Sequence, residues 1–216
     1  VGLIATAIIL VIGSIYGSVA AFFGGWVDLV MMRIVDIIYS LPDLLVIILL
    51  STVLKQTIAP AIEGTFLADL GTGMISIFIV FALLYWVGMA RLIRGQVMTI
   101  KQQDYVLASK SMGARGAHII RKHMIPNCVS VIIITAAMQI PSAIFTESFL
   151  SFVGMGVSMP MPSLGSLASD ARSGLVSYPY MLVFPALTIF LIVLSFNLLG
   201  NGLRDAFNPS LRGTED

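Results

Sequence analysis

Charged residues are scarce in this chain. Lysine, arginine, aspartate and glutamate make up 11% of its 216 residues, against roughly 25% in an ordinary soluble domain. Hydrophobic residues make up 58%, and the mean hydropathy is +1.00. Several apolar runs approach the roughly 20 residues that cross a hydrocarbon core. Because these runs are continuous rather than alternating with period two, the composition predicts an all-α, polytopic membrane protein.

Other absences narrow the functional classes. The single cysteine, Cys128, allows no internal disulfide, and we expect it to be a packing residue. No G-x-x-x-x-G-K-[ST] phosphate loop occurs, so any ATP must bind to another chain. Both histidines, His118 and His123, lie outside the apolar runs. This argues against an intramembrane serine hydrolase, which needs a serine and a histidine facing each other at depth.

Five spans are predicted, at about residues 1–22, 26–54, 73–97, 127–152 and 181–203. Pro42 should bend the second span or start a fresh helix there, and Pro141 should interrupt the fourth. Residues 154–179 are rich in Gly, Pro and Ser, which favours a structured loop. We interpret residues 1–216 as one domain. The chain opens at Val1 inside an apolar run, and we expect an earlier span, the sixth of a complete chain, to be missing from it.

The basic residues predict which side of the membrane each loop faces. If the loop after the third span is cytoplasmic, only Lys55 and Arg172 of the 12 basic residues lie outside. Such asymmetry is typical of the positive-inside rule. It places the following residues inside: Arg33, Arg91, Arg94, Lys101, Lys110, Arg115, Arg121, Lys122, Arg204 and Arg212. Asp28, Arg33 and Asp36 are then interpreted as a charge cluster at a helix end.

The stretch DYVLASKSMGARGAHIIRKHMIPN, residues 104–127, is charged where its neighbours are apolar. We expect a short helix capped by Asp104, with Tyr105, Ala108 and Met112 on one face. Gly113 can end it in a left-handed conformation. A second helix should follow, with Ala117, Ile120 and Met124 on one side. This helix–turn–helix predicts either a plug for another protein or an amphipathic hairpin on the lipid headgroups.

The same stretch resembles the EAA loop of ATP-binding-cassette (ABC) importer permeases, whose pattern is E-A-A, three residues, G, nine residues, I-x-L-P. The corresponding residues are Leu107, Ala108, Ser109, Gly113, His123, Met124, Ile125 and Pro126. Leu107 in place of glutamate is the clearest departure. GGWVDLVMMRIVDIIYSLPDLL, GMARLIRGQV, ESFLSFVGMGV and FNLLGNGLRDAFNPSLR extend the likeness to the dipeptide/oligopeptide/nickel branch, and to the second permease subunit of its pair.

The resemblance implies the type I permease fold and a subunit of an ATP-driven importer of di- or oligopeptides in a prokaryotic cytoplasmic membrane. Import of nickel or another small solute is the alternative, followed by a channel or scaffold outside the ABC class. The implied partners are a second homologous permease, two cytoplasmic ATP-binding subunits, an extracytoplasmic solute-binding protein and the lipid bilayer, with no nucleic acid, no cofactor and no enzymatic activity of its own. The binding protein would dock around residues 55–72 and 155–180.

The resemblance also implies that residues 98–126 form a coupling loop that docks in a cleft of the ATPase. The docking residues on this interpretation are Asp104, Tyr105, Leu107, Ala108, Ser109, Met112, Gly113, Ala114, Arg115, Ile125 and Pro126. Ala108 and Ser109 would permit close approach, and Gly113 would set the angle between the two short helices.

A few polar and small residues within the spans raise further expectations. Glu147 is expected either to brace the following loop or to line the substrate path. Asn197 and Asn201, four residues apart, should hydrogen-bond a neighbouring helix. Gly13 and Gly17 form a G-x-x-x-G spacing that would let two helices approach closely.

Overall fold

The structure is a computed structural model that describes residues 1–62, 64–157 and 161–207. In these ranges the regular structure is helical throughout, without a strand. Five helical stretches there are long and apolar enough to cross a membrane. They are Gly2–Phe23, Asp43–Ile62, Thr72–Ile100, Val129–Phe152 and Tyr180–Ala206. The predicted all-α, multi-pass architecture is therefore confirmed.

Two of the predicted spans are divided by a break. The second predicted span consists of α2 (Gly25–Tyr39) and α3 (Asp43–Ile62), with the fresh start after Pro42 that the sequence predicts. The stretch long enough to cross a membrane is α3, which begins and ends later than predicted. The third span consists of α4 (Thr72–Leu84) and α5 (Trp86–Ile100), which meet at Tyr85. The first span is the single helix α1 (Gly2–Phe23).

The last two spans are continuous helices, α9 (Val129–Phe152) and α11 (Tyr180–Ala206). The predicted interruption at Pro141 is wrong, because α9 runs straight through it. Pro141 is among the most completely buried side chains. Proline is tolerated inside membrane helices where neighbouring helices pack around the freed backbone group.

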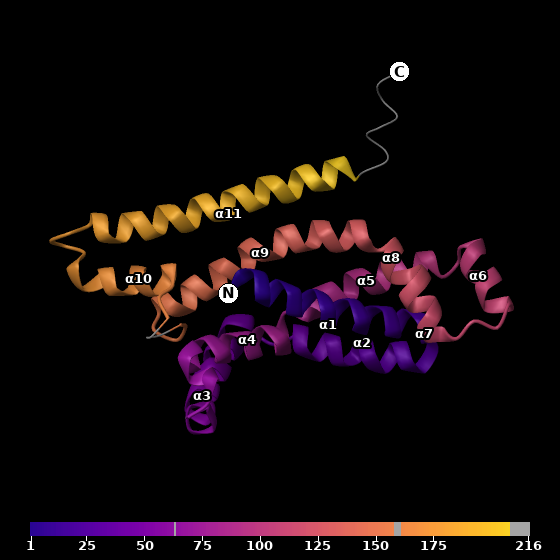
Figure 1. Cartoon of the computed structure of the whole chain (residues 1–216), viewed down its shortest axis with the longest axis horizontal. Helices are drawn as coiled ribbons and strands as arrows, with labels where there is room; N and C mark the ends of the chain where they lie inside the picture. The colour runs from indigo at the N-terminus through magenta and orange to yellow at the C-terminus, as the bar shows by residue number, and fades with distance from the viewer. Residues whose placement is uncertain (63, 158–160, 208–216) are drawn as a thin grey trace, which may run out of the picture.

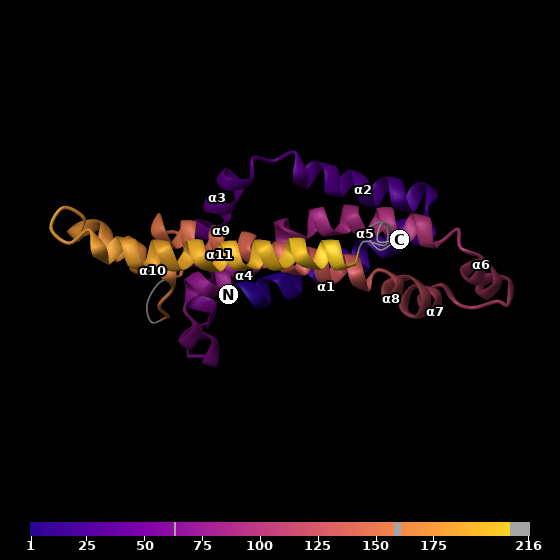
Figure 2. The same ribbon diagram turned by 90° about the horizontal axis from the view of Figure 1, so that it is seen from above.

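Shorter elements gather at the two ends of the molecule. At one end lie α6 (Asp104–Ser111), α7 (Gly116–Ile119), the π-helical turn η2 (Ile120–Met124) and α8 (Ile125–Asn127). At the other end lie α10 (Leu164–Asp170) and the 3₁₀ turn η3 (Ala171–Gly174). A further 3₁₀ turn, η1 (Phe66–Leu70), precedes α4. Figures 1 and 2 both place α6 and α7 opposite α10 along the long axis, while α3 turns away from that axis.

The most extensive helix contact joins α1 to α5. A Cβ added at Gly13 would lie 2.6 Å from Cβ of Met89, and one added at Gly17 would collide with the carbonyl oxygen of Ala90. The missing side chains therefore let the two backbones touch. The close approach predicted from the G-x-x-x-G spacing is confirmed, and its partner is α5.

Helix α11 is the least buried of the five candidate spans. Only Pro185 and Gly200 of this helix are buried, and Gly200 packs against Met138 of α9. Asn197 and Asn201 are exposed, and in the described ranges neither side chain makes the interhelical hydrogen bond that was predicted. Within this chain α11 meets α9 at the small residue Gly200, and a bond from either asparagine to a neighbouring helix stays a prediction.

Gly17→Ala should destabilise the protein by about 1–3 kcal/mol, because the new methyl group must push two backbones apart. Gly95→Ala on α5 is the matched control, since nothing lies within 4 Å of its added Cβ. Thermal unfolding of the two purified variants in detergent measures the difference. Equal melting temperatures would show that the α1–α5 contact does not limit stability.

Candidate functional site

The turn at Gly113 fixes the direction of the charged segment. Helix α6 ends at Ser111, and Gly113 has φ +80°. Its N–H donates to Lys110 O at 3.0 Å, and the N–H of Ala114 donates to Ser109 O at 3.2 Å. These two bonds form a Schellman motif, which needs a left-handed residue. The predicted glycine helix stop is therefore confirmed, although the start of α6 differs from prediction. Asp104 was expected to cap α6 but is its first helical residue. The N-cap position is occupied by Gln103, whose side chain makes no capping hydrogen bond.

The second half of the segment is helical from Gly116 to Asn127 but changes pitch within it. The π-helical turn at Ile120–Met124 comes just before Pro126, which has no N–H to donate. A π-helical turn contains one residue more than an α-helical turn. The two buried residues on this helix, Ile119 and Met124, are therefore five positions apart instead of three or four. Ala117 is exposed, so the predicted face of Ala117, Ile120 and Met124 is wrong.

Most of the predicted docking residues are exposed at this end of the molecule. Among the large apolar members of this set, Met112 is 81% exposed, Leu107 49% and Tyr105 43%. The other exposed members of the predicted set are Asp104, Ala108, Gly113, Arg115 and Pro126, while Ala114 and Ile125 are half-buried. The first helix therefore presents an apolar surface to its surroundings.

Ser109 lies on the opposite side of α6. Its side chain is 7% exposed, beside Val106 at 3%, so both face the body of the protein. Of Ala108 and Ser109, only Ala108 is available to a partner, which corrects the expectation that both permit its close approach. On the other short helix, Gly116 packs against the ring of Phe22. The segment is thus held against the end of α1.

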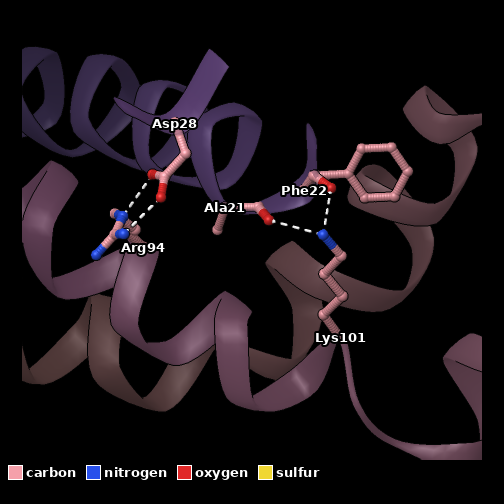
Figure 3. A network of polar contacts seen from close by, with 5 residues as sticks. All are labelled: Ala21, Phe22, Asp28, Arg94 and Lys101. Carbon is pink, nitrogen blue, oxygen red and sulfur yellow. Dashed lines mark hydrogen bonds and ion pairs between the residues drawn. The ribbon is translucent and has the colours of Figure 1, made fainter. Parts of the chain in front are cut away.

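A lysine joins the start of this segment to α1. Nζ of Lys101 donates to the carbonyl oxygens of Ala21 at 3.2 Å and Phe22 at 2.7 Å, as Figure 3 shows. These carbonyls lie in the last turn of α1, where helical partners are missing and a positive charge is favourable. From the sequence, Lys101 was predicted only to lie on the inner side of the membrane, and its contact with α1 was missed.

An ion pair joins α2 to α5 beside that lysine (Figure 3). Nε and Nη2 of Arg94 each donate to one carboxylate oxygen of Asp28 at 2.5 Å. Asp28 lies in the first turn of α2, outside the five candidate spans. The hydrogen bond from Arg94 lowers the pKa of Asp28 below its ordinary value, and burial partly opposes this shift.

A second ion pair joins the same two helices. Nη2 of Arg91 lies 2.8 Å from Oδ1 of Asp36, and the guanidinium stacks 4.1 Å from the centre of the Tyr39 ring. Asp28 and Asp36 are therefore interhelical partners of arginines on α5, rather than a charge cluster at one helix end. Arg33 is exposed.

Glu147 sits at the other end of the molecule, where α9 leads into the outer loop. Its side chain is 5% exposed and accepts a 2.8 Å hydrogen bond from Ser151 Oγ. The same oxygen of Ser151 accepts from the backbone N–H of Val157 at 2.9 Å. This chain ties the loop to α9 through Ser151, which sequence reasoning missed although it is one helical turn after Glu147. The geometry supports the bracing role, which stays a prediction.

The described part of the chain offers no metal site. No group of three or more His, Cys, Asp and Glu side chains is arranged there to hold an ion. Cys128, just before α9, is 1% exposed in the core, and burial raises the pKa of its thiol. It is therefore the packing residue that was expected.

These features define a multi-pass helical membrane protein with a helix–turn–helix segment at one end and, at the other, a loop hydrogen-bonded to α9 through Ser151. Residues 9–213 match the family of binding-protein-dependent transport system inner membrane components. The chain belongs to this family. The match covers all five candidate spans except the first residues of α1.

The relatives found by sequence comparison are transport permeases. The chain is 42% identical over 212 residues to the oligopeptide transport system permease protein of Bacillus subtilis, covering 98% of this chain and 64% of that protein. It is 44% identical over 213 residues to the dipeptide transport system permease protein of the same organism, covering 98% and 62%. Identity to the glutathione transport system permease protein of Pectobacterium atrosepticum is 36% over 211 residues, covering 98% and 65%. The chain thus spans less than two thirds of the length of these relatives.

Ser151→Ala should loosen the outer loop, because it leaves Oε1 of Glu147 and the N–H of Val157 without their partner. Each unsatisfied buried group costs about 1–3 kcal/mol. Hydrogen exchange of the Val157 amide should accelerate, as followed by mass spectrometry. Ser142→Ala, which removes only an exposed hydroxyl on the same helix, should leave that exchange unchanged. An unaltered Val157 amide in Ser151→Ala would rule out the brace.

The Asp28–Arg94 pair should make the stability of the fold depend on pH in the acidic range. Because the folded-state pKa of Asp28 lies below its ordinary value of 3.8, the stabilisation is complete above that value and is lost as pH falls through the folded-state pKa. At neutral pH, the melting temperature of the wild type should therefore be higher than that of Asp28→Asn. The difference between the two melting temperatures should shrink below about pH 3.8. Asp205→Asn, which changes an exposed carboxylate, should show no such trend. A gap that persists in acid would contradict the ionic origin.

Proposed function

We propose that the chain is the membrane part of an ABC importer permease that moves di- or oligopeptides across a prokaryotic cytoplasmic membrane. The observation that carries this proposal is the exposed helix–turn–helix around Gly113, at one end of a bundle whose family membership is established. Such a segment can serve as a handle for an ATPase. The chain itself is then a transport subunit, and ATP hydrolysis belongs to its partners.

The distribution of charge supports a cytoplasmic position for that end. Lys110, Arg115, Arg121 and Lys122 lie in the segment, and Lys101 lies where it begins. Cytoplasmic loops carry such an excess of basic residues. The end with α10, where Arg172 lies, would then face outward. Arg212, which the sequence also places inside, lies outside the described residues.

The packing of the segment supports transmission of force. Docking would act on the exposed side of α6, at Tyr105, Leu107 and Met112. The other side is attached to the bundle through Val106 and Ser109. When ATP binding closes the ATPase pair, a displacement of α6 would reach α1 and α5 and shift the balance between inward- and outward-facing states.

The partner subunits follow from the same proposal. A second homologous permease would complete the pathway, since α11 and its neighbours leave a large apolar surface exposed. Two ATP-binding subunits would dock below, and a solute-binding protein would dock on the outer loops, where Ser151 and Glu147 tie the backbone at Val157. The lipid bilayer would cover the remaining apolar surface.

Peptides are the favoured cargo because the relatives named above carry oligopeptides, dipeptides and glutathione, itself a peptide. The alternative of nickel or another small solute has no comparable support. The test is ATP-dependent uptake of labelled peptides into proteoliposomes that contain the assembled importer. Uptake of a nickel chelate without uptake of peptides would replace the favoured cargo by the alternative.

Gly113→Leu should weaken association with the ATP-binding subunits and lower transport. The left-handed conformation at this position costs a branched residue about 1–2 kcal/mol, equivalent to roughly 5- to 30-fold in the population of the correct turn. Co-purification of the ATPase and peptide uptake measure the two effects.

Gly113→Asn is the matched control, since asparagine is close to leucine in size but tolerates the left-handed conformation. Nothing lies within 4 Å of an added Cβ at this position, so crowding cannot explain a difference between the variants. Normal ATPase association and normal uptake in Gly113→Leu would count against the docking proposal.

A further inference from the structure

A cavity lies between the exposed helix α6 and the end of α1. Its volume is about 650 Å³. Val106, Leu107 and Lys110 line its wall on the α6 side, and Ala21 and Phe22 line its wall on the α1 side. Where the cavity lies, the two helices do not press on each other. A displacement of α6 therefore has to reach α1 through contacts at the edges of the cavity.

The first of these edge contacts is made by Lys101, the residue that follows the end of α5. Its Nζ donates to the carbonyl oxygens of Ala21 and Phe22 (Figure 3) and lies 6.0 Å from the centre of the Phe22 ring. A lysine in this place could stabilise the last carbonyls of its own helix, but this one reaches across to α1. It therefore joins the base of the charged segment to the last turn of a different span.

The second edge contact is made by Gly116, the first residue of α7. A Cβ added there would lie 2.5 Å from Cε1 and 3.0 Å from Cζ of the Phe22 ring. The ring thus rests directly on the backbone of α7, and a side chain at position 116 would displace it. Ile119, in the same helix, is 1% exposed and lines the same cavity.

Both edge contacts fall on Phe22. Lys101 precedes α6 and Gly116 follows it, so the two ends of the exposed helix and its turn are tied to a single residue of α1. Phe22 is the last residue but one of α1, and the next helix begins after Gly24 and Gly25, whose φ angles are +66° and +54°. No side chain braces that junction, so the end of α1 can follow a displacement of Phe22.

We propose that Phe22, held between Lys101 and Gly116, is the joint through which the charged segment moves the membrane spans. This inference rests on the proposed function, in which an ATPase displaces α6. Because the two holding contacts lie before and after α6, its displacement shifts Phe22 and carries α1, with α5 packed on it, toward the other state. Lys101 and Gly116 are positioning residues, since they act through Phe22 and not on nucleotide or peptide.

A purely structural role for these contacts predicts a different result. Contacts that only stabilise the fold set the amount of assembled importer, so their loss lowers transport and ATP hydrolysis together. A joint that transmits displacement sets how much peptide moves for each ATP hydrolysed. The ratio of peptide transported to ATP hydrolysed therefore separates the two roles.

The first test measures this ratio in proteoliposomes that contain the complete importer, with a labelled tripeptide as cargo. Lys101→Met keeps the aliphatic chain and removes the donor. It should lower the ratio about tenfold, the effect of one charge-assisted hydrogen bond, while the ATPase co-purifies as with the wild type. Lys101→Arg keeps a charged donor and should recover most of the ratio.

Arg33→Met is the matched control for the loss of a positive charge. Arg33 is exposed on α2, and within the described ranges it forms no ion pair. Its substitution should leave the ratio at the wild-type value.

The second test exchanges space between Phe22 and Gly116. Gly116→Ala alone pushes a methyl group against the ring and should lower the ratio roughly fivefold, the effect of a small-to-large change in a packed contact. In Phe22→Ala the ring is gone and the joint is already broken, so adding Gly116→Ala should cause no further loss. Independent effects would multiply instead. This test changes no charge, so it decides the question if Lys101→Met does not assemble.

The outcomes separate this inference from the function on which it rests. If the wild type takes up no peptide with ATP, the peptide importer is wrong and the joint falls with it. If the wild type takes up peptide and Lys101→Met keeps the wild-type ratio, the joint is overturned and peptide import stands. Losses that multiply in the double variant, or an equal loss in Arg33→Met, would overturn the joint as well.

Discussion

The contact between α1 and α5 is the constraint on which the rest of the structure depends. Gly13 and Gly17 remove the side chains that would hold these backbones apart. Because the spans are uniformly apolar, hydrophobicity alone cannot choose which helices pair in a membrane, and close packing has to do so. Once α5 lies on α1, its end at Ile100 starts the charged segment beside the end of α1, where Lys101 meets the free carbonyls.

The few charges of the chain are arranged around this pair of helices. Arg94 and Arg91 of α5 reach Asp28 and Asp36 of α2, and these two ion pairs hold α2 beside α5. At the far end, Glu147 is satisfied by serine hydroxyls instead of a cation. In a medium where an unpartnered charge is expensive, the pairing of each ionisable group is informative.

Predictions from the sequence were correct where the backbone preference of a single residue decides the local structure. The helix start after Pro42 and the left-handed turn at Gly113 follow from proline and glycine stereochemistry alone. The same rules failed at Pro141, because packing by neighbouring helices carries α9 through the break. The side of Ala117 was also mispredicted, since the π-helical turn before Pro126 shifts the buried face by one residue, and regular helical spacing cannot anticipate that shift.

The sequence by itself determined that the chain lies in a membrane, that it has five apolar spans and that it turns at Gly113. Apolar composition decides the first two, and the backbone stereochemistry of one glycine decides the third. It also carried the family resemblance that the comparisons bear out. Only the tertiary structure decided that Ser109 faces inward, that Ser151 links Glu147 to the outer loop, and that Lys101 and Gly116 meet at Phe22. Those facts join residues far apart in the chain or on opposite helix faces, and long-range packing sets them.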